Sequence, residues 1–183
     1  LLIAITGTLT GSVIGLIIGM IRTIPVNPTD SKLKKGLFKV INWVLSVYIE
    51  IFRGTPMIVQ AMVIFYGLAF ATGKSMPVLL AGFVIVSINT GAYMAEIVRG
   101  GIIAVDKGQF EAAHSIGMNH WQTMVNIVMP QVLRNILPAT GNEFVINIKD
   151  TSVLSVISVT ELFFASRSIA GINFKYFQVF LIT

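Results

Sequence analysis

Residues 111–130, EAAHSIGMNHWQTMVNIVMP, form a polar, amphipathic island between two long apolar runs. This pattern predicts two short helices joined as a hairpin. Asp106 is suited to cap the start of the first helix, and Gly117 suits the left-handed backbone that ends it. Asn119 is suited to cap the second helix, which Pro130 is expected to close. A water-exposed hairpin held between membrane spans predicts a docking element for another protein.

Each hairpin helix is expected to gather small or apolar side chains on one face, because they recur at helical spacing. Such a compact face would be available to a partner. Its predicted members are Ala112, Ala113 and Ile116 on the first helix and Trp121, Met124, Val125 and Val128 on the second.

The composition places the whole chain in a membrane. Of its 183 residues, 55% are hydrophobic and 11% are charged, whereas ordinary soluble domains carry about 25% charged residues. We therefore expect an all-α integral membrane protein, with residues 1–183 as one transmembrane domain and residues 104–130 as a cytoplasmic loop within it. The absence of cysteine excludes disulfides and thiolate metal sites.

Four long apolar segments predict the membrane spans, and a shorter one predicts the start of a fifth. The spans are expected at residues 1–21, 57–71, 78–98 and 131–164, with the last apolar run at 174–183. Residues 36–52 carry a periodic polar stripe and are expected to form a helix that lies at the membrane interface or packs beside the bundle, while 22–39 and 166–173 are expected to be loops. The first and last helices are expected to be truncated, the last continuing past Thr183.

Most of the 13 Lys and Arg residues fall on one side of this arrangement, where the positive-inside rule places the cytoplasm. This bias accounts for the net charge of +5 without nucleic acid, and it predicts a chain that starts outside and keeps the hairpin inside. The predicted cytoplasmic residues are Arg22, Lys32, Lys34, Lys35, Lys39, Arg53, Arg99, Lys107 and Arg134, against Lys74, Arg167 and Lys175 on the other side.

The first span carries Gly7, Gly11, Gly15 and Gly19 four residues apart. They form one bare ridge, which allows close approach of a neighbouring helix. We favour packing within the chain over a contact between two chains.

The fourth span contains Glu143, Lys149 and Asp150, although a charge at the bilayer centre costs at least about 2.5–3.5 kcal/mol. Glu143 and Asp150 are seven residues apart and share a helix face. We therefore expect both carboxylates, with Asn89 of the third span, to line a substrate passage. Two carboxylates on one face suit a cationic side chain. For Lys149 a structural ion pair with Asp150 or Glu96 is an equal alternative.

Asp150, Thr151 and Ser152 are expected to cap a new half-helix after a break in the fourth span. No pattern predicts a catalytic or metal site. Residues 72–75, TGKS, lack the glycine that a phosphate-binding loop needs at position 68, and His114 and His120 lack the spacing of a helical zinc pair. We therefore expect no enzyme, and any ATP must bind to another chain.

The hairpin resembles the EAA signature of permease subunits in ATP-binding-cassette (ABC) importers, with Met129 where leucine is usual. The matching residues are Glu111, Ala112, Ala113, Gly117, Ile127 and Pro130. Other motifs resemble the polar amino-acid branch of that family. They are RGTP at 53–56, the run from Ala92 to Ile102, and KDTS at 149–152 preceded by Asn142 and Glu143. Glutamate after that asparagine resembles the permeases for basic amino acids, whereas glutamine is familiar among glutamine permeases.

The resemblance implies a five-helix permease core in the cell membrane, with a cytoplasmic coupling hairpin. It implies an ATPase subunit that carries ATP and Mg, a second permease subunit, identical or homologous, and an extracytoplasmic amino-acid-binding protein or fused receptor domain, besides membrane lipid. The expected substrates are polar amino acids, with a preference for arginine, lysine or histidine. Glutamine, glutamate or cystine within the same class, and an ion-coupled secondary transporter, are the alternatives. The expected ATPase-coupling residues are Glu111, Ala112, Ala113, Gly117, Ile127 and Pro130, and the expected passage residues are Glu143, Asp150, Asn89, Lys149, Thr151 and Ser152.

Overall fold

The computed structural model describes residues 1–26 and 30–183, and every regular element in those ranges is helical, as the composition predicts. Residues 27–29 of the first expected loop lie outside the described part. The α-helices are α1 (Leu2–Ile21), α2 (Lys32–Gly54), α3 (Met57–Thr72), α4 (Val78–Ile103), α5 (Lys107–Ser115), α6 (His120–Thr123), α7 (Met129–Asp150), α8 (Leu162–Asn173) and α9 (Tyr176–Ile182). A π-helical segment, Met124–Val128, joins α6 to α7, and a 3₁₀ helix, Thr151–Ile157, extends α7.

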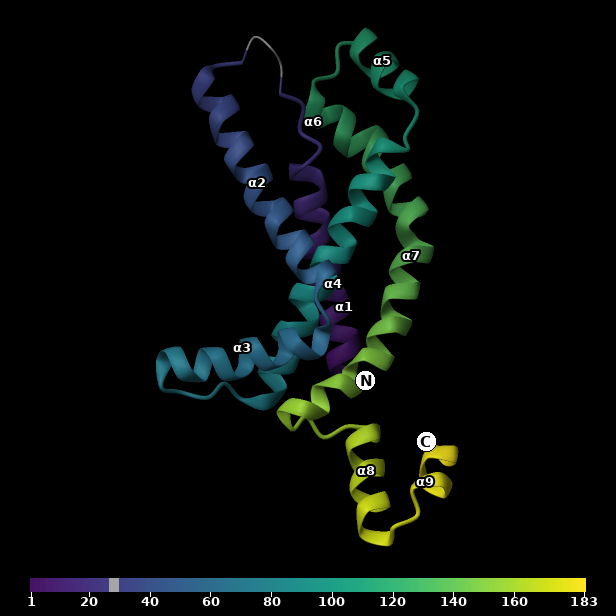
Figure 1. The fold of residues 1–183 in the computed structure, drawn as a ribbon. Helices are drawn as coiled ribbons and strands as arrows, with labels where there is room; N and C mark the ends of the chain where they lie inside the picture. The colour runs from purple at the N-terminus through teal and green to yellow at the C-terminus, as the bar shows by residue number, and fades with distance from the viewer. Residues whose placement is uncertain (27–29) are drawn as a thin grey trace.

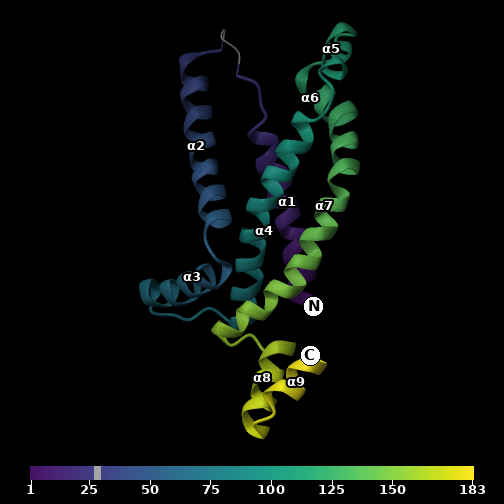
Figure 2. The same ribbon diagram turned by 45° about the vertical axis from the view of Figure 1, so that its right-hand side comes forward.

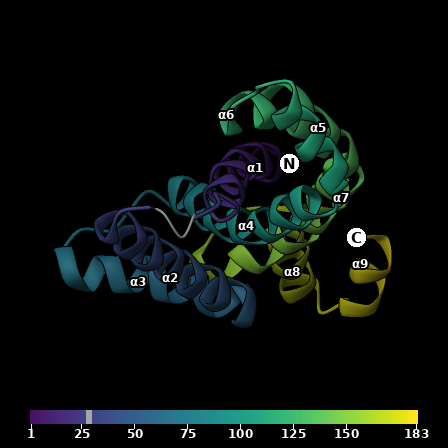
Figure 3. The same cartoon turned by 90° about the horizontal axis from the view of Figure 1, so that it is seen from above.

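Helices α1 and α4 run side by side through the middle of the molecule, with α2 on one side and α7 on the other (Figures 1 and 3). Helices α5 and α6 lie together at one end, the same end at which α2 begins, and we call this the hairpin end (Figure 1). Helices α3, α8 and α9 lie at the opposite end (Figure 2). The N-terminus of the chain is also at that opposite end, and α1 and α4 both run from there toward the hairpin end, parallel to each other.

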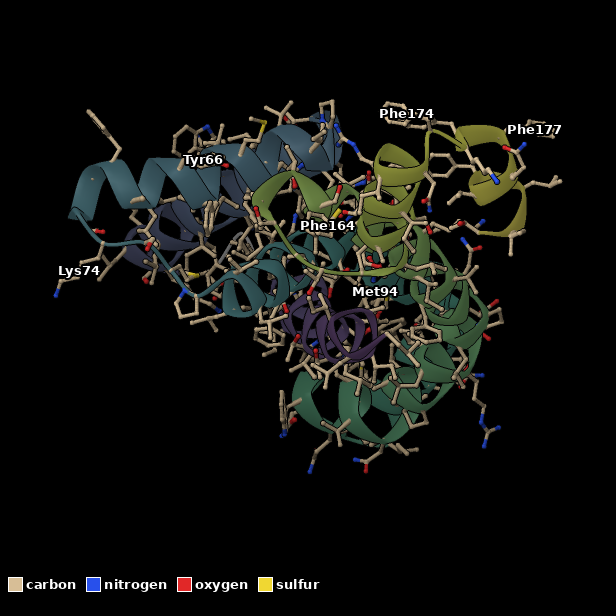
Figure 4. All side chains as sticks on the ribbon, turned by 90° about the horizontal axis from the view of Figure 1, so that it is seen from below. Tyr66, Lys74, Met94, Phe164, Phe174 and Phe177 are labelled. Atoms are coloured by element: carbon tan, nitrogen blue, oxygen red, sulfur yellow. The ribbon has the colours of Figure 1, made fainter. Side chains whose placement is uncertain are left out.

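The glycine ridge of α1 packs against α4 of the same chain, which confirms the preference for packing within the chain. Gly7, Gly11, Gly15 and Gly19 face, in order, Val86, Thr90, Met94 and Val98. Figure 4 places Met94 beside α1, near the middle of the molecule. A Cβ at Gly11 would come within 2.5 Å of the Thr90 Cβ, so only glycine permits this helix separation.

A buried polar contact joins α7 to the same pair of helices. The Asn147 side-chain amide donates to the Thr8 hydroxyl at 2.8 Å and to the Thr90 hydroxyl at 2.9 Å. Buried amides need such partners, since an unpaired polar group in an apolar interior costs free energy. The contact therefore fixes α7 on α1 and α4 halfway along the bundle.

Helices α1 and α4 are each long and apolar enough to cross a membrane, with mean hydropathies of 2.0 and 1.8. Two bent pairs meet the same test together: α2 with α3, and the continuous segment His120–Ile157 with α8. Helix α3, at the expected span 57–71, has 16 residues and meets the test only together with α2. Of the two expectations for residues 36–52, packing beside the bundle is confirmed, since α2 contacts α4. Helix α2 packs along α4, and α3 turns from it by 114°.

The turn between α2 and α3 follows from Pro56, which has no N–H and disfavours a helical residue before it. Thr55 is accordingly extended, with φ −119° and ψ 146°. Its hydroxyl donates to the Ile51 carbonyl at 2.7 Å and so does not cap α3, and Pro56 precedes the helix. Because α2 runs away from the hairpin end, Arg53 lies at the opposite end of this helix from Lys32, which corrects its expected grouping with Lys32.

The expected break near Asp150 is also wrong. Asp150 makes no capping hydrogen bond, and the hydroxyls of Thr151 and Ser152 donate back to carbonyls three residues earlier, at 2.8 and 2.7 Å. The helix instead continues as a 3₁₀ helix until Ser158, whose φ is 69°. Glu161 then caps α8, which is bent by 54° from the preceding segment and includes the residues expected to form a loop at 166–173.

Candidate functional site: the hairpin and the polar interior

The hairpin forms with the local signals that the sequence carries. The Asp106 carboxylate accepts from the Gly108 N–H at 2.6 Å and caps α5. Asn119 and Gln122 form a reciprocal capping box at the start of α6, with both bonds at 2.9 Å. Gly117 has φ 82°, the left-handed conformation expected at the end of α5. These three predictions are confirmed.

Pro130 does not close the second helix, because the chain passes through the π-helical segment into α7. Proline is tolerated near the start of a helix, where its missing N–H is not required. Two side chains supply donors around this segment. The Asn126 amide donates to the Gln122 carbonyl and the Gln131 amide to the Ile127 carbonyl, both at 2.9 Å. Pro130 is exposed at the start of α7.

The predicted apolar faces of the hairpin are each divided between the interior and the surface. Ala113 is 1% exposed, and Met124 and Val128 are also buried, against the ends of α4 and α7. Ile116 and Trp121, in contrast, are 77% and 71% exposed. Glu111, Ala112 and Gly117 are exposed, and Ile127 is half-buried. The hairpin therefore has a buried face that fixes it to the bundle and an outer face that carries large, uncovered apolar side chains.

The expected passage residue Asn89 makes contacts that hold the α2–α3 turn. Its amide donates to the Gln60 side-chain oxygen at 2.9 Å and to the Phe52 carbonyl at 3.2 Å. Gln60 donates in turn to the carbonyls of Phe52 and Thr55, at 3.0 and 2.9 Å. These carbonyls belong to the end of α2, where no helical N–H remains to bond them. Gln60 was not among the predicted site residues, although a single amide side chain within the apolar run 57–71 was the available signal.

Glu143 is 8% exposed, on α7. No hydrogen bond or ion pair is present at its carboxylate within the described ranges. The charge of Asp150 repels it and the charge of Arg53 attracts it. The Arg53 guanidinium lies 5.5 Å from the centre of the Tyr93 ring, on α4. The structure thus adds a cation from α2 to the expected carboxylate pair, which sequence spacing could not place there.

The remaining expected passage residues lie around a different space. Lys149, Thr151 and Ser152 line a cavity of about 390 Å³ between the end of α7, α8 and the two chain termini, together with Glu161. In the part of the chain that the structure describes, no ion pair joins Lys149 to Asp150 or to Glu96. The six residues therefore do not form one lining. Asn89 contacts the α2–α3 turn, Glu143 is buried on α7 and repelled by the charge of Asp150, and the other three residues line the cavity beside α8.

Glu96 is instead paired with two arginines that the sequence analysis did not combine. Arg99, one turn further along α4, donates to the Glu96 carboxylate from Nε at 3.1 Å and from Nη2 at 2.7 Å. Arg22, at the end of α1, forms an ion pair with the other oxygen of the same carboxylate and donates to the Ser46 hydroxyl of α2 at 3.2 Å. This cluster joins three helices.

Comparison with known proteins identifies the class that this fold and hairpin define, a membrane-embedded permease domain. Residues 33–183 match the family described as "Binding-protein-dependent transport system inner membrane component". The chain belongs to this family. Within it the chain is similar to the permease subunits of ABC importers for polar amino acids, which are translocation components and not enzymes.

Three curated relatives are similar over most of the chain. The probable amino-acid permease protein YxeN of Bacillus subtilis is 38% identical over 151 residues, which are 81% of this chain and 67% of the relative. The glutamine transport system permease protein GlnP of Escherichia coli is 40% identical over 139 residues, 75% of this chain and 64% of the relative. The L-cystine transport system permease protein TcyB of Bacillus subtilis is 40% identical over 142 residues, which are 78% of this chain and 60% of the relative. The chain thus spans about two thirds or less of these relatives' lengths.

Two solved structures share the fold. A chain of an amino acid ABC transporter crystallised with histidines is 37% identical, with a TM-score of 0.83, and the match covers 98% of this chain and 78% of that one. A chain of the methionine ABC transporter MetNI in an inward-facing conformation is 17% identical, with a TM-score of 0.76, and the match covers 98% of this chain and 82% of that one. The second likeness shows the fold alone.

Proposed function

We propose that this chain is the permease subunit of an ATP-driven importer for polar amino acids in the cell membrane, with its hairpin bound to a cytoplasmic ATPase subunit. The hairpin carries the proposal: it projects from one end of the bundle, is fixed by its buried face and leaves Ile116 and Trp121 uncovered. Family membership and the named amino-acid permeases support the same function. ATP and Mg would bind to the ATPase, and the hairpin would transmit its movement to α7 through the π-helical segment.

Two further partners follow from this proposal. A second permease subunit, identical or homologous, would complete the membrane passage, and an extracytoplasmic amino-acid-binding protein or fused receptor domain would deliver the substrate. The distribution of Lys and Arg, with Lys32, Lys34, Lys35 and Lys107 near the hairpin end, supports a cytoplasmic hairpin.

The hairpin is tested by an exposed substitution that leaves the fold intact. Ala112→Glu places a charge on the outer face of α5, whereas the neighbouring Ala113 is buried and unsuitable. We expect Ala112→Glu to abolish co-purification of the ATPase subunit and uptake of amino acids, while the permease itself remains monodisperse. His114→Gln, on the opposite face of the same helix, is the control. Unchanged ATPase attachment in the Ala112→Glu variant would refute the docking role.

For the substrate we propose a preference for basic amino acids. Glu143 and Asp150 place two carboxylates on one face of α7, and Arg53 near Glu143 is suited to bind a substrate carboxylate. Glutamine and cystine are the alternatives within the same class, because the named relatives transport them.

Uptake assays with the complete transporter decide between these substrates. We expect Glu143→Gln to weaken uptake of labelled arginine and histidine about tenfold or more, because a hydrogen bond to a charged group is worth about 1.5–3 kcal/mol. Basal ATPase activity and glutamine uptake should change little. Glu143→Asp keeps the charge and should retain a larger part of arginine uptake, and Asn142→Ser, at an exposed neighbour, should have no effect. Equal arginine uptake by Glu143→Gln and parent would refute the assignment.

A further inference from the structure

A second cavity lies between the membrane helices and the hairpin. It has a volume of about 320 Å³ and is bounded by the end of α1, the end of α4 and the α5–α6 hairpin. All its ionisable lining side chains are basic, and no carboxylate lines it. We call it the basic cavity; its lining residues are Arg22, Thr23, Arg99, Ile102, Ile103, Val105, Lys107, Phe110, His120 and Met124.

The positive charge of the basic cavity is only partly neutralised. Arg22 and Arg99 share the carboxylate of Glu96, and these three side chains also line an adjoining cavity of about 230 Å³ beside α2, together with Glu50 and Arg53. Even with Glu50 counted, two carboxylates face three guanidinium groups there. Lys107 adds a further positive charge to the basic cavity, and within the described ranges its ammonium group makes no ion pair or hydrogen bond. Asp106, the nearest acidic neighbour in sequence, caps α5 through the Gly108 N–H and is not part of the lining.

The floor of the cavity is apolar. Ile102, Val105 and Met124 are buried at the junction between α4 and the hairpin, with Phe110 packed against them. At the rim, Ile103 is 64% exposed. The cavity therefore offers cationic donors above an apolar surface, which fits an anion attached to an aliphatic group and not a small hydrated ion.

The position of the cavity adds a second argument. Among the described helices, α1 and α4 are each long and apolar enough to cross a membrane alone, and the basic cavity lies where both end. Phospholipid phosphates occupy this depth of a bilayer, and basic pockets between helix ends are suited to bind them. An acidic segment of a partner protein would meet the same cations but would have no need of the apolar rim.

We propose that the basic cavity binds the phosphate of an anionic phospholipid, held by Lys107 and the two arginines, with its glycerol and upper acyl carbons against Ile103. The bound lipid bridges the helix ends and α5, and it steadies the hairpin against the bundle. This site is separate from the proposed substrate passage and does not depend on which amino acid is transported.

The experiment uses the full chain in lipid nanodiscs, with native mass spectrometry of retained phosphatidylglycerol as the readout. We expect Lys107→Gln to weaken phosphatidylglycerol retention about fivefold, since one surface cation contributes about 1 kcal/mol to anionic lipid binding. Lys39→Gln removes the same charge from an exposed site on α2, outside the cavity, and should change retention much less. Thermal stability of both variants in phosphatidylcholine checks that the fold is intact.

Three results would overturn the proposal. One is equal retention by Lys107→Gln and Lys39→Gln, which would indicate unspecific surface attraction. Another is displacement of the lipid by millimolar inorganic phosphate, which would indicate a site for a free anion. The third is a loss of ATPase-subunit binding in Lys107→Gln with lipid retention unchanged, which would assign the cavity to a protein partner.

Discussion

Replacing Gly15 by alanine tests whether the central α1–α4 contact depends on the glycine ridge. A Cβ at this position would lie 2.7 Å from the carbonyl carbon of Met94 and 2.8 Å from the amide nitrogen of Ala95, and closer still to the Met94 Cβ. Ordinary Cβ contacts begin at 3.4 Å. Because two of these neighbours are backbone atoms of α4, no side-chain rotation relieves the clash, and the two helices must separate.

Overpacking of this kind costs about 1–3 kcal/mol. Alanine returns about 0.5–1 kcal/mol through its better helix propensity, so we expect a net loss of about 1–2 kcal/mol in the free energy of unfolding. Gly36→Ala on α2 is the matched control, because no atom lies within 4 Å of its added Cβ. The control should be neutral or slightly more stable, so the two substitutions are expected to differ in sign.

The measurement is reversible unfolding in mixed micelles by titration with dodecyl sulfate, followed by far-UV circular dichroism. Thiol-reactive reporter dyes do not apply, since the chain has no cysteine. A net loss of about 1.4 kcal/mol lowers the folded-to-unfolded ratio about tenfold and should shift the midpoint to less denaturant. A Gly15→Ala variant as stable as Gly36→Ala would refute the argument that backbone proximity at this point requires glycine.

Two further substitutions test local contacts. Asn147→Leu removes the amide that joins α7 to α1 and α4 and should lower the free energy of unfolding by about 1–3 kcal/mol in the same titration, whereas Asn142→Leu at an exposed site should not; equal midpoints would contradict the contact. Asn119→Ala removes the capping box and should lower the local stability of α6 by about 1 kcal/mol. We expect faster amide hydrogen exchange in α6 and unchanged exchange in α4. The same exchange rates in α6 of variant and parent would show that the cap contributes nothing.

Features that depend only on neighbouring residues could be predicted from the sequence. The all-α membrane class follows from composition, and the hairpin follows from caps that operate over a few residues, at Asp106, Gly117 and Asn119. The glycine spacing of α1 likewise predicted a close helix contact, because residues four apart lie on the same helix face whichever helix packs against it.

Sequence periodicity failed where a helix changed its type or direction. The π-helical segment and the 3₁₀ extension alter the number of residues per turn, so Trp121 and Met124 fall on different surfaces and the expected break at Asp150 does not occur. The same limit explains Pro130, which begins α7 and does not end α6.

Interactions between charges on different helices, in contrast, depend on how the helices pack. Arg22 and Glu96 are 74 residues apart in sequence, and the charge of Arg53 attracts Glu143 from a different helix without an ion pair, so no local spacing could have predicted either interaction. Both interactions follow from the close α1–α4 packing and from the turn that brings the end of α2 to α4. Long side chains reach partners that helix packing selects, and packing depends on contacts distributed over the whole chain.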